Sequence, residues 1–241
     1  MNLRELKKRI PTGNREWFNA TNDEQPEVFI YDEIGRGFFG GGVAPDDLIK
    51  AVKGMKLKSK DTLNVRINSP GGDVFDGNTI YNYLRSIQQE VVVTIDGLAA
   101  SAASIIAMAG DTIRMPENSF LMIHNPWMFA AGDSRIMRKA AEDLDEIREG
   151  AIKTYLSHSN VQRKELVQML DEETWLGADK AIELGFADEL IEPVRAAALA
   201  KFHLEDYFSR VPDGISDIQK KERMEREGMR AELKRLKVLT H

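Results

Sequence analysis

The sequence predicts an α/β protein built around a mainly parallel sheet. Short runs rich in β-branched and apolar residues alternate along the chain with segments whose apolar residues recur at helical spacing. This alternation is typical of strands joined by crossover helices. At 241 residues the chain is long enough for one sizeable core with appendages, so we expect one main domain.

The first half of this domain is expected to alternate strand and helix. Acidic residues in the first turn and a one-sided apolar face predict a helix at 45–55. The run VVVTI predicts a buried strand, which a tight turn at Gly97 would join to a helix whose first turn carries Ser101. We therefore expect strands at 27–32, 62–67 and 91–95, and helices at 45–55, from 77 and from 101.

The second half contains a different kind of element. Residues 133–157 read as a charged helix with an apolar stripe, too long and too polar to serve only as a crossover. Such a helix usually packs on a partner, which makes it a candidate oligomer contact. Around it we expect strands at 112–115, 120–124 and 186–191, and short helices at 163–170 and 178–184.

Composition narrows the class of protein. A net charge of -6 argues against a dedicated nucleic-acid binder, although local basic patches remain compatible with it. The absence of cysteine excludes disulfides, thiol catalysis and thiolate metal sites, and it fits the cytoplasm. The N-terminus is charged and lacks the apolar region of a secretory signal, and no apolar run is long enough to predict a membrane span.

Three motifs carry the candidate chemistry. Ser101 lies in GLAASAAS, where a helix start offers free N–H groups to an anion, so it is placed for nucleophilic attack. The same serine would equally serve as an N-cap or a small packing residue. His124, in MIHNP, ends an apolar strand and is a candidate general base, although a structural histidine there would be unremarkable. INSPGG, at 67–72, requires a sharply turned backbone.

Together with ETWLGADKAIELGFADELI at 173–191, these motifs resemble, in order and spacing, the four signature blocks of ClpP, the Clp protease proteolytic subunit. The resemblance implies the ClpP/crotonase-like fold of repeated β-β-α units with a projecting handle helix. It also implies a serine endopeptidase that needs no cofactor and no metal. The protease domain would span 27–192, between an N-terminal arm at 1–26 and a C-terminal helical appendage at 193–241.

The resemblance also assigns roles to residues. Ser101 aligns with the nucleophile and His124 with its general base. The family's acid falls on Glu173, a glutamate in place of the usual aspartate, and Asp171 is the alternative acid. The backbone N–H groups of Gly72 and Ala102 would form the oxyanion hole. The implied substrate-binding residues flank an extended peptide on its two sides: Asp73, Val74, Asn125, Pro126, Trp127 and Met128.

Within this family the chain looks most like the phage-type members that act as prohead, or capsid maturation, proteases. This predicts a ring-forming homo-oligomer in the cytoplasm of a bacterial host, or inside the prohead, that cleaves capsid, scaffold or portal proteins. The first alternative is the proteolytic subunit of a degradation complex fed by an ATP-driven unfoldase. Alternatives of another class are a crotonase-type acyl-CoA enzyme and a non-catalytic assembly scaffold. The basic stretch at 218–239 would dock to an assembly partner or be trimmed.

Overall fold

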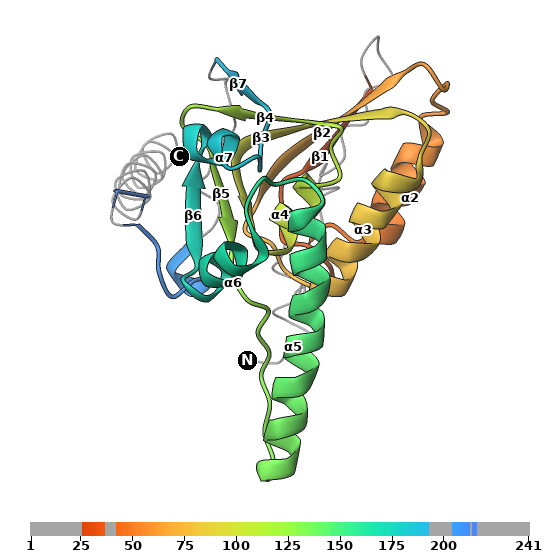
Figure 1. Cartoon of the computed structure of the whole chain (residues 1–241). Helices are drawn as coiled ribbons and strands as arrows, with labels where there is room; N and C mark the ends of the chain where they lie inside the picture. Colours follow the sequence, from red (N-terminus) through yellow and green to blue (C-terminus); the bar gives the residue numbers. More distant parts are fainter. Residues whose placement is uncertain (1–25, 37–41, 193–203, 213, 216–241) are drawn as a thin grey trace, which may run out of the picture.

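The computed structural model describes residues 26–36, 42–192, 204–212 and 214–215, which fold around a seven-stranded sheet (Figure 1). Its main path runs in the order β1-β2-β3-β4-β7, and all four pairings along it are parallel. The mainly parallel sheet predicted from the sequence is therefore confirmed. The strands of this path are β1 (Glu27–Ile30), β2 (Thr62–Ser69), β3 (Glu90–Ala100), β4 (Thr112–Pro116) and β7 (Glu189–Ile191).

Two further strands form a branch of the sheet that starts at β3. β5 (Phe120–Ile123) pairs in parallel with the last part of β3, and β6 (Thr174–Gly177) pairs antiparallel with β5. The sheet thus splits at β3, with β4 on the first part of the strand and β5 on its end. This branch brings together three segments that are far apart in the sequence.

The helices cover the sheet and complete the core. α2, α3 and α4 contact one another in succession beside β1 and β2, and α4 also contacts α5 (Ser134–Leu156) (Figure 1). The core contains fully buried aliphatic side chains from strands and helices, including Ile30, Leu63, Ile95 and Ile106. The bounds are α2 (Pro45–Gly54), α3 (Val74–Ser86), α4 (Ala102–Ala107), α6 (Arg163–Asp171) and α7 (Ala178–Glu183).

β3 is longer than the sequence predicts. It continues through Gly97 to Ala100, although its register against β2 shifts between the pair of Ile67 with Ile95 and the pair of Ser69 with Ala99. On this stretch Ala99 pairs with Ser69 of β2 on one side and with Leu121 of β5 on the other. The turn comes at Ser101, whose φ is 53° and ψ is -127°. The predicted tight turn at Gly97 is therefore wrong, because small residues there allow a strand to lie between two neighbours.

α3 begins before Gly77, where the sequence placed its start. Asp73 is its N-cap, with the carboxylate accepting the N–H groups of Phe75 and Asp76 at 2.9 Å each. The cap satisfies donors that the first turn of a helix would otherwise leave without partners. The double glycine therefore leads almost directly into a helix.

α5 (Ser134–Leu156) projects from the body of the protein as a handle (Figure 1). Its described buried residues, Ala151, Ile152 and Tyr155, all lie in its C-terminal part. Ile136 and Met137, near its other end, are 52% and 39% exposed. No helix in the described ranges is both long and apolar enough to cross a bilayer.

Residues 204–212 and 214–215, which we call the C-terminal segment, fold back onto the sheet. Leu204, Phe208 and Ile215 are buried in a second apolar cluster. Its other members come from the ends of β3 and β5: Leu98, Ala100 and Met122. Of the helical appendage expected at 193–241, the structure describes the 3₁₀ turn Leu204–Asp206, and the stretch at 218–239 lies outside the described residues.

Candidate active site

Ser101 sits on a strained turn between β3 and α4. A positive φ is uncommon for a residue other than glycine, and such strain often accompanies function. The backbone is held on both sides: the Ser101 N–H donates to the Met122 carbonyl at 3.0 Å, and its own carbonyl accepts the Ser104 N–H at 2.9 Å. The Ser104 hydroxyl also donates to that carbonyl, at 2.6 Å. The turn therefore fixes the direction of the Ser101 side chain.

His124 reaches Ser101 because of the pairing between β3 and β5. Ala100 and Met122 are partners in that pairing, so the residues that follow each strand emerge at the same edge. Ser101 Oγ lies 2.8 Å from His124 Nε2. This is a hydrogen-bonding distance, short enough for the imidazole to take the hydroxyl proton.

Glu173 lies on the other side of the imidazole. The antiparallel pairing of Ile123 with Thr174 places it beside His124, with Oε1 3.5 Å from Nδ1. Glu173 itself has a φ of 50°, and its Oε2 is buried without a hydrogen-bond partner in the described part of the chain. An acceptor next to Nδ1 favours the tautomer that leaves Nε2 free to receive a proton.

Asp171, the alternative acid, points elsewhere. Its Oδ1 accepts a hydrogen bond from the Asn125 amide at 2.7 Å and lies 3.3 Å from a guanidinium nitrogen of Arg148. The two acidic residues therefore have different partners: Glu173 faces His124, and Asp171 faces Asn125 and Arg148. The Asn125 side chain, expected near substrate, is occupied by this contact.

The electrostatics of the pair follow from burial. The side chains of His124 and Glu173 are 6% and 18% exposed. Burial lowers the pKa of His124, and the adjacent Glu173 carboxylate opposes this by stabilising the imidazolium. Burial has the larger effect, so the imidazole is neutral at neutral pH and can act as a base.

The double glycine packs directly against the turn at Ser101. A Cβ on Gly71 would lie 2.6 Å from the Ala100 carbonyl oxygen, and one on Gly72 would lie 2.2 Å from the Ile34 carbonyl oxygen. The Ile34 N–H donates to Gly71 at 2.7 Å, and the Ile34 carbonyl accepts the Asp73 N–H at 3.0 Å. Only glycine permits this close approach at both positions.

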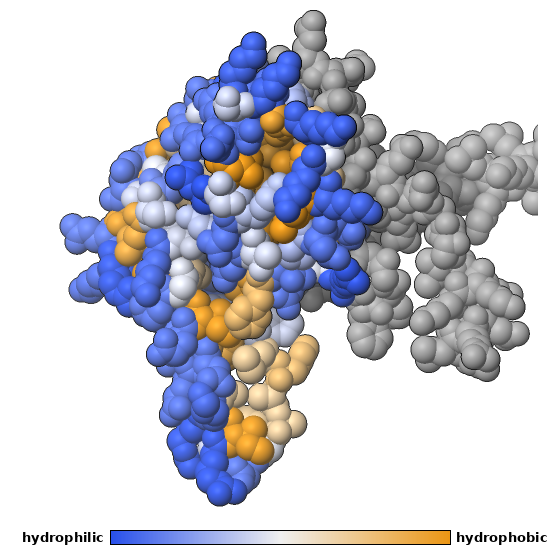
Figure 2. Space-filling model, turned by 90° about the vertical axis from the view of Figure 1, so that its right-hand side faces the viewer, coloured by the Kyte–Doolittle hydropathy of each residue, from blue (hydrophilic) through white to orange (hydrophobic). Residues whose placement is uncertain are grey.

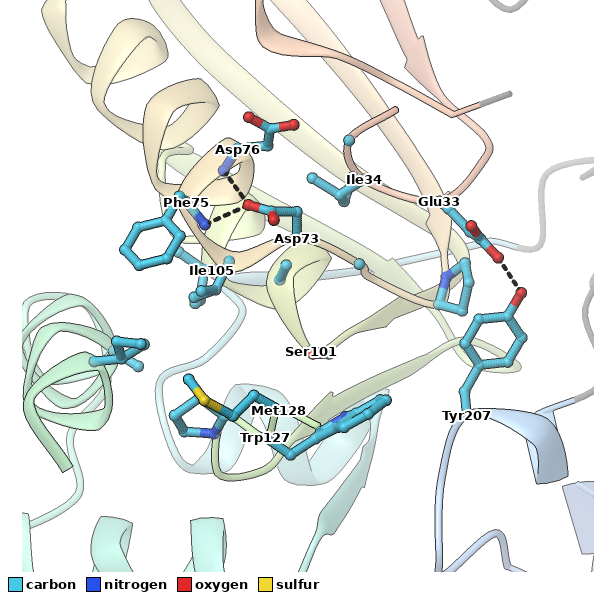
Figure 3. Close-up of a pocket in the computed structure, with 18 of the residues that line it drawn as sticks. Glu33, Ile34, Asp73, Phe75, Asp76, Ser101, Ile105, Trp127, Met128 and Tyr207 are labelled. Carbon is cyan, nitrogen blue, oxygen red and sulfur yellow. Dashed lines mark hydrogen bonds between the residues drawn. The ribbon is translucent and has the colours of Figure 1, made fainter. Parts of the chain in front are cut away.

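A pocket of about 920 Å³ opens over Ser101 (Figure 3). It is lined by Gly72 and by Ala102, whose N–H, at the first position of α4, has no acceptor within the helix. Among the expected substrate-binding residues, Asp73, Val74, Pro126, Trp127 and Met128 line it. The carboxylate of Asp73 caps α3, so what it presents to the pocket is the turn itself.

The described residues contain no group of three or more histidine, aspartate or glutamate side chains placed to hold a metal ion. The site is thus made of a hydroxyl, an imidazole, a carboxylate and backbone N–H groups. This set suits covalent catalysis of acyl transfer.

Sequence reasoning missed the C-terminal segment as part of the site. Tyr207 and Phe208 line the pocket, and the Tyr207 hydroxyl donates to Glu33, bridging one end of it (Figure 3). The Phe208 ring meets the His124 ring edge to face, with centroids 5.7 Å apart. The only signal in the sequence was the spacing of apolar and aromatic residues in this segment. That spacing predicts that the residues are buried and does not indicate what they contact.

Comparison with known proteins places the chain in a family. The Clp protease family model matches residues 46–194. An ATP-dependent Clp protease proteolytic subunit from Deinococcus radiodurans is 27% identical over 136 residues, covering 55% of this chain and 66% of that protein. ATP-dependent Clp protease proteolytic subunit 1 from Protochlamydia amoebophila is 30% identical over 170 residues, covering 68% and 79% respectively.

Among solved structures, a ClpP1 mutant from Listeria monocytogenes superposes with a TM-score of 0.60 at 26% identity. The match covers 71% of this chain and 93% of that one. The family model spans more than half of the sequence and includes Ser101, His124 and Glu173. The fold and these matches show that the chain belongs to the Clp protease family.

Proposed function

We propose that this protein is a serine endopeptidase. The observation that carries the proposal is the 2.8 Å contact between Ser101 Oγ and His124 Nε2, with Glu173 3.5 Å from the other ring nitrogen. In the proposed reaction Ser101 Oγ attacks the peptide carbonyl carbon while His124 takes its proton. Glu173 stabilises the imidazolium so formed.

The backbone supplies the remaining group. The N–H groups of Gly72 and Ala102 would bind the oxyanion of the tetrahedral intermediate. His124 then returns the proton to the leaving amine, and the C–N bond breaks. Water attacks the resulting acyl-enzyme ester by the same route, which releases the second product and restores Ser101.

Replacing Ser101 with alanine tests this chemistry. Ser101→Ala should lower peptide cleavage by several orders of magnitude and abolish labelling by a fluorophosphonate probe. Ser86→Ala is the matched control, because Ser86 is an exposed serine on α3 whose hydroxyl donates to the Tyr83 carbonyl. Cleavage that persists in Ser101→Ala would refute the assignment, and acyl-CoA turnover without labelling of the wild type would favour the crotonase-type alternative.

We also propose that the protein assembles into a ring-shaped homo-oligomer, with the handle joining two rings face to face. The segment that follows His124 and the N-terminal part of α5 expose apolar side chains, and Figure 2 shows apolar surface on the projecting part of the molecule. An exposed apolar surface of this kind usually marks an interaction site. The exposed residues are Trp127, Met128, Phe129, Ile136 and Met137.

For the biological role we propose maturation of capsid or scaffold proteins without an unfoldase. Support comes from the sequence: the N-terminal arm does not resemble the family's unfoldase-docking loop, and about 50 residues follow the last protease block. The names of the similar proteins instead favour a subunit of an ATP-dependent Clp degradation complex. Incubating the purified protein with casein and with a folded capsid or scaffold protein separates the two roles. Cleavage that requires ATP and an unfoldase would overturn the maturation role.

A further inference from the structure

We propose that the C-terminal segment belongs to the active site, with Phe208 and Ser209 as positioning residues that hold His124 and Glu173. This inference rests on the proposed peptidase function. It adds a part of the chain beyond 46–194, the residues that the family model matches.

Phe208 packs against the imidazole of His124. It is 6% exposed, and its ring meets His124 edge to face at 5.7 Å and Trp175 edge to face at 5.5 Å. Contacts of this kind resist rotation of either ring. Because Phe208 also excludes water from the imidazole, it contributes to the burial that keeps His124 neutral.

Ser209 acts on the carboxylate. Its N–H lies 3.4 Å from Glu173 Oε1, the same oxygen that faces His124. The neighbouring Arg210 guanidinium donates to the Glu172 carbonyl at 3.3 Å, so two successive residues of the segment bind the turn that carries the acid. Glu173 has a positive φ and a buried oxygen without a partner in the described part of the chain, and a turn so strained needs external support.

The segment is anchored well enough to position these groups. Leu204 and Ile215, on either side of Phe208, are 1% and 7% exposed on the apolar cluster formed with the ends of β3 and β5. Those strand ends lead directly into Ser101 and His124. The C-terminal segment, which we call the clamp because it holds His124 and Glu173, is therefore packed into one unit with the catalytic groups.

A simpler role would be to cover the apolar face of the sheet. Val211 separates the two possibilities, since it packs on the same cluster while Phe208 also contacts His124. If the segment only covers the apolar face of the sheet, Phe208→Ala and Val211→Ala should both lower the stability of the protein. Neither should then change the pKa of His124 or the rate of cleavage. If the segment positions His124 and Glu173, Phe208→Ala should change the pKa of His124 and the rate of cleavage, and Val211→Ala should change neither.

The test compares the full-length wild type with Phe208→Ala, Phe208→Leu and Val211→Ala. Phe208→Ala should lower kcat at least tenfold with KM within twofold of wild type. It should also move the acid limb of the kcat profile to higher pH, because water reaching His124 relieves the burial that lowers its pKa. Phe208→Leu should recover most of the rate, and Val211→Ala should match the wild type.

Other charges around the ring do not account for such a shift. Glu173 faces His124 in every one of these variants. Asp171 is paired with Arg148, and Arg210 donates to a backbone carbonyl, so neither is directed at the imidazole. The Phe208 substitutions leave all of these groups in place.

NMR titration of His124 in histidine-labelled protein gives a readout that does not depend on peptide cleavage. A higher imidazole pKa in Phe208→Ala and an unchanged one in Val211→Ala would support the clamp even if the wild type cleaved no peptide, an outcome that would refute only the proposed function. Equal effects of the two alanine variants, or a change confined to KM, would overturn the clamp. If Phe208→Ala does not fold, Ser209→Pro serves as the second variant, because it removes the N–H donor to Glu173. An undiminished kcat in Ser209→Pro would also overturn the clamp.

Discussion

Replacing Glu173 with glutamine should slow the enzyme by about three to four orders of magnitude. Glutamine keeps the size of the side chain and an oxygen for the Ser209 N–H, but it removes the charge that faces the imidazolium. At the 3.5 Å separation of Nδ1 and Oε1, and with an effective dielectric of about 20, the lost attraction is about 5 kcal/mol. Each 1.4 kcal/mol of lost transition-state stabilisation is about a factor of ten in rate.

The assay is steady-state cleavage of a fluorogenic peptide, with the concentration of folded sites fixed by fluorophosphonate titration at long times. Asp171→Asn is the matched control, and we expect less than a threefold change because its carboxylate contacts Asn125 and Arg148. Thermal denaturation of both variants checks that the fold is kept. The reasoning is refuted if Glu173→Gln retains more than a tenth of the wild-type kcat, or if Asp171→Asn is the more damaging change.

Three further outcomes are expected. kcat/KM should rise with pH through a midpoint below the ordinary imidazole pKa, because burial lowers the pKa of His124 and the neutral ring is the base; a midpoint above that value in a pH-rate profile would contradict this. Gly72→Ala should reduce acylation about 100-fold, measured by stopped-flow with an active ester, because its Cβ would lie 2.2 Å from the Ile34 carbonyl oxygen and displace the proposed oxyanion donor. Phe129→Asp should reduce the mass measured by light scattering, since Phe129 is 93% exposed on the proposed contact surface, and an unchanged mass would move the contact elsewhere.

Local patterns predict most of the elements of this fold. Strand and helix periodicities need only neighbouring residues, so the parallel sheet and the long helix could be anticipated. The end of β3 could not, because a strand through Gly97 is stabilised by pairing with β2 and β5, which lie elsewhere in the sequence. The start of α3 was placed late for a related reason: Asp73 was considered as a substrate contact, and its capping role depends on the geometry of the preceding glycines.

The candidate site also contains residues that the sequence predicts and residues that depend on tertiary packing. Ser101, His124 and Glu173 lie within recognisable blocks, and their spacing was sufficient to nominate them. The contact between Asn125 and Asp171 could not be predicted, because the local backbone conformation decides that Asp171 turns away from His124 while Glu173 faces it. The spacing around Phe208 predicts burial and not a partner, since its contact with His124 arises from the packing of the C-terminal segment on the sheet.

The carbonyl of Ser101 links the nucleophile to the handle. Because the Ser104 hydroxyl gives its hydrogen to that carbonyl, the Tyr155 hydroxyl, 2.8 Å from Ser104 Oγ, must be the donor of their shared bond. Tyr155 is 1% exposed in the C-terminal part of α5, so a shift of this helix would break a chain of hydroxyls that ends at the nucleophile. The last turns of α5 and the turn that presents the nucleophile are therefore held together by hydrogen bonds through Ser104.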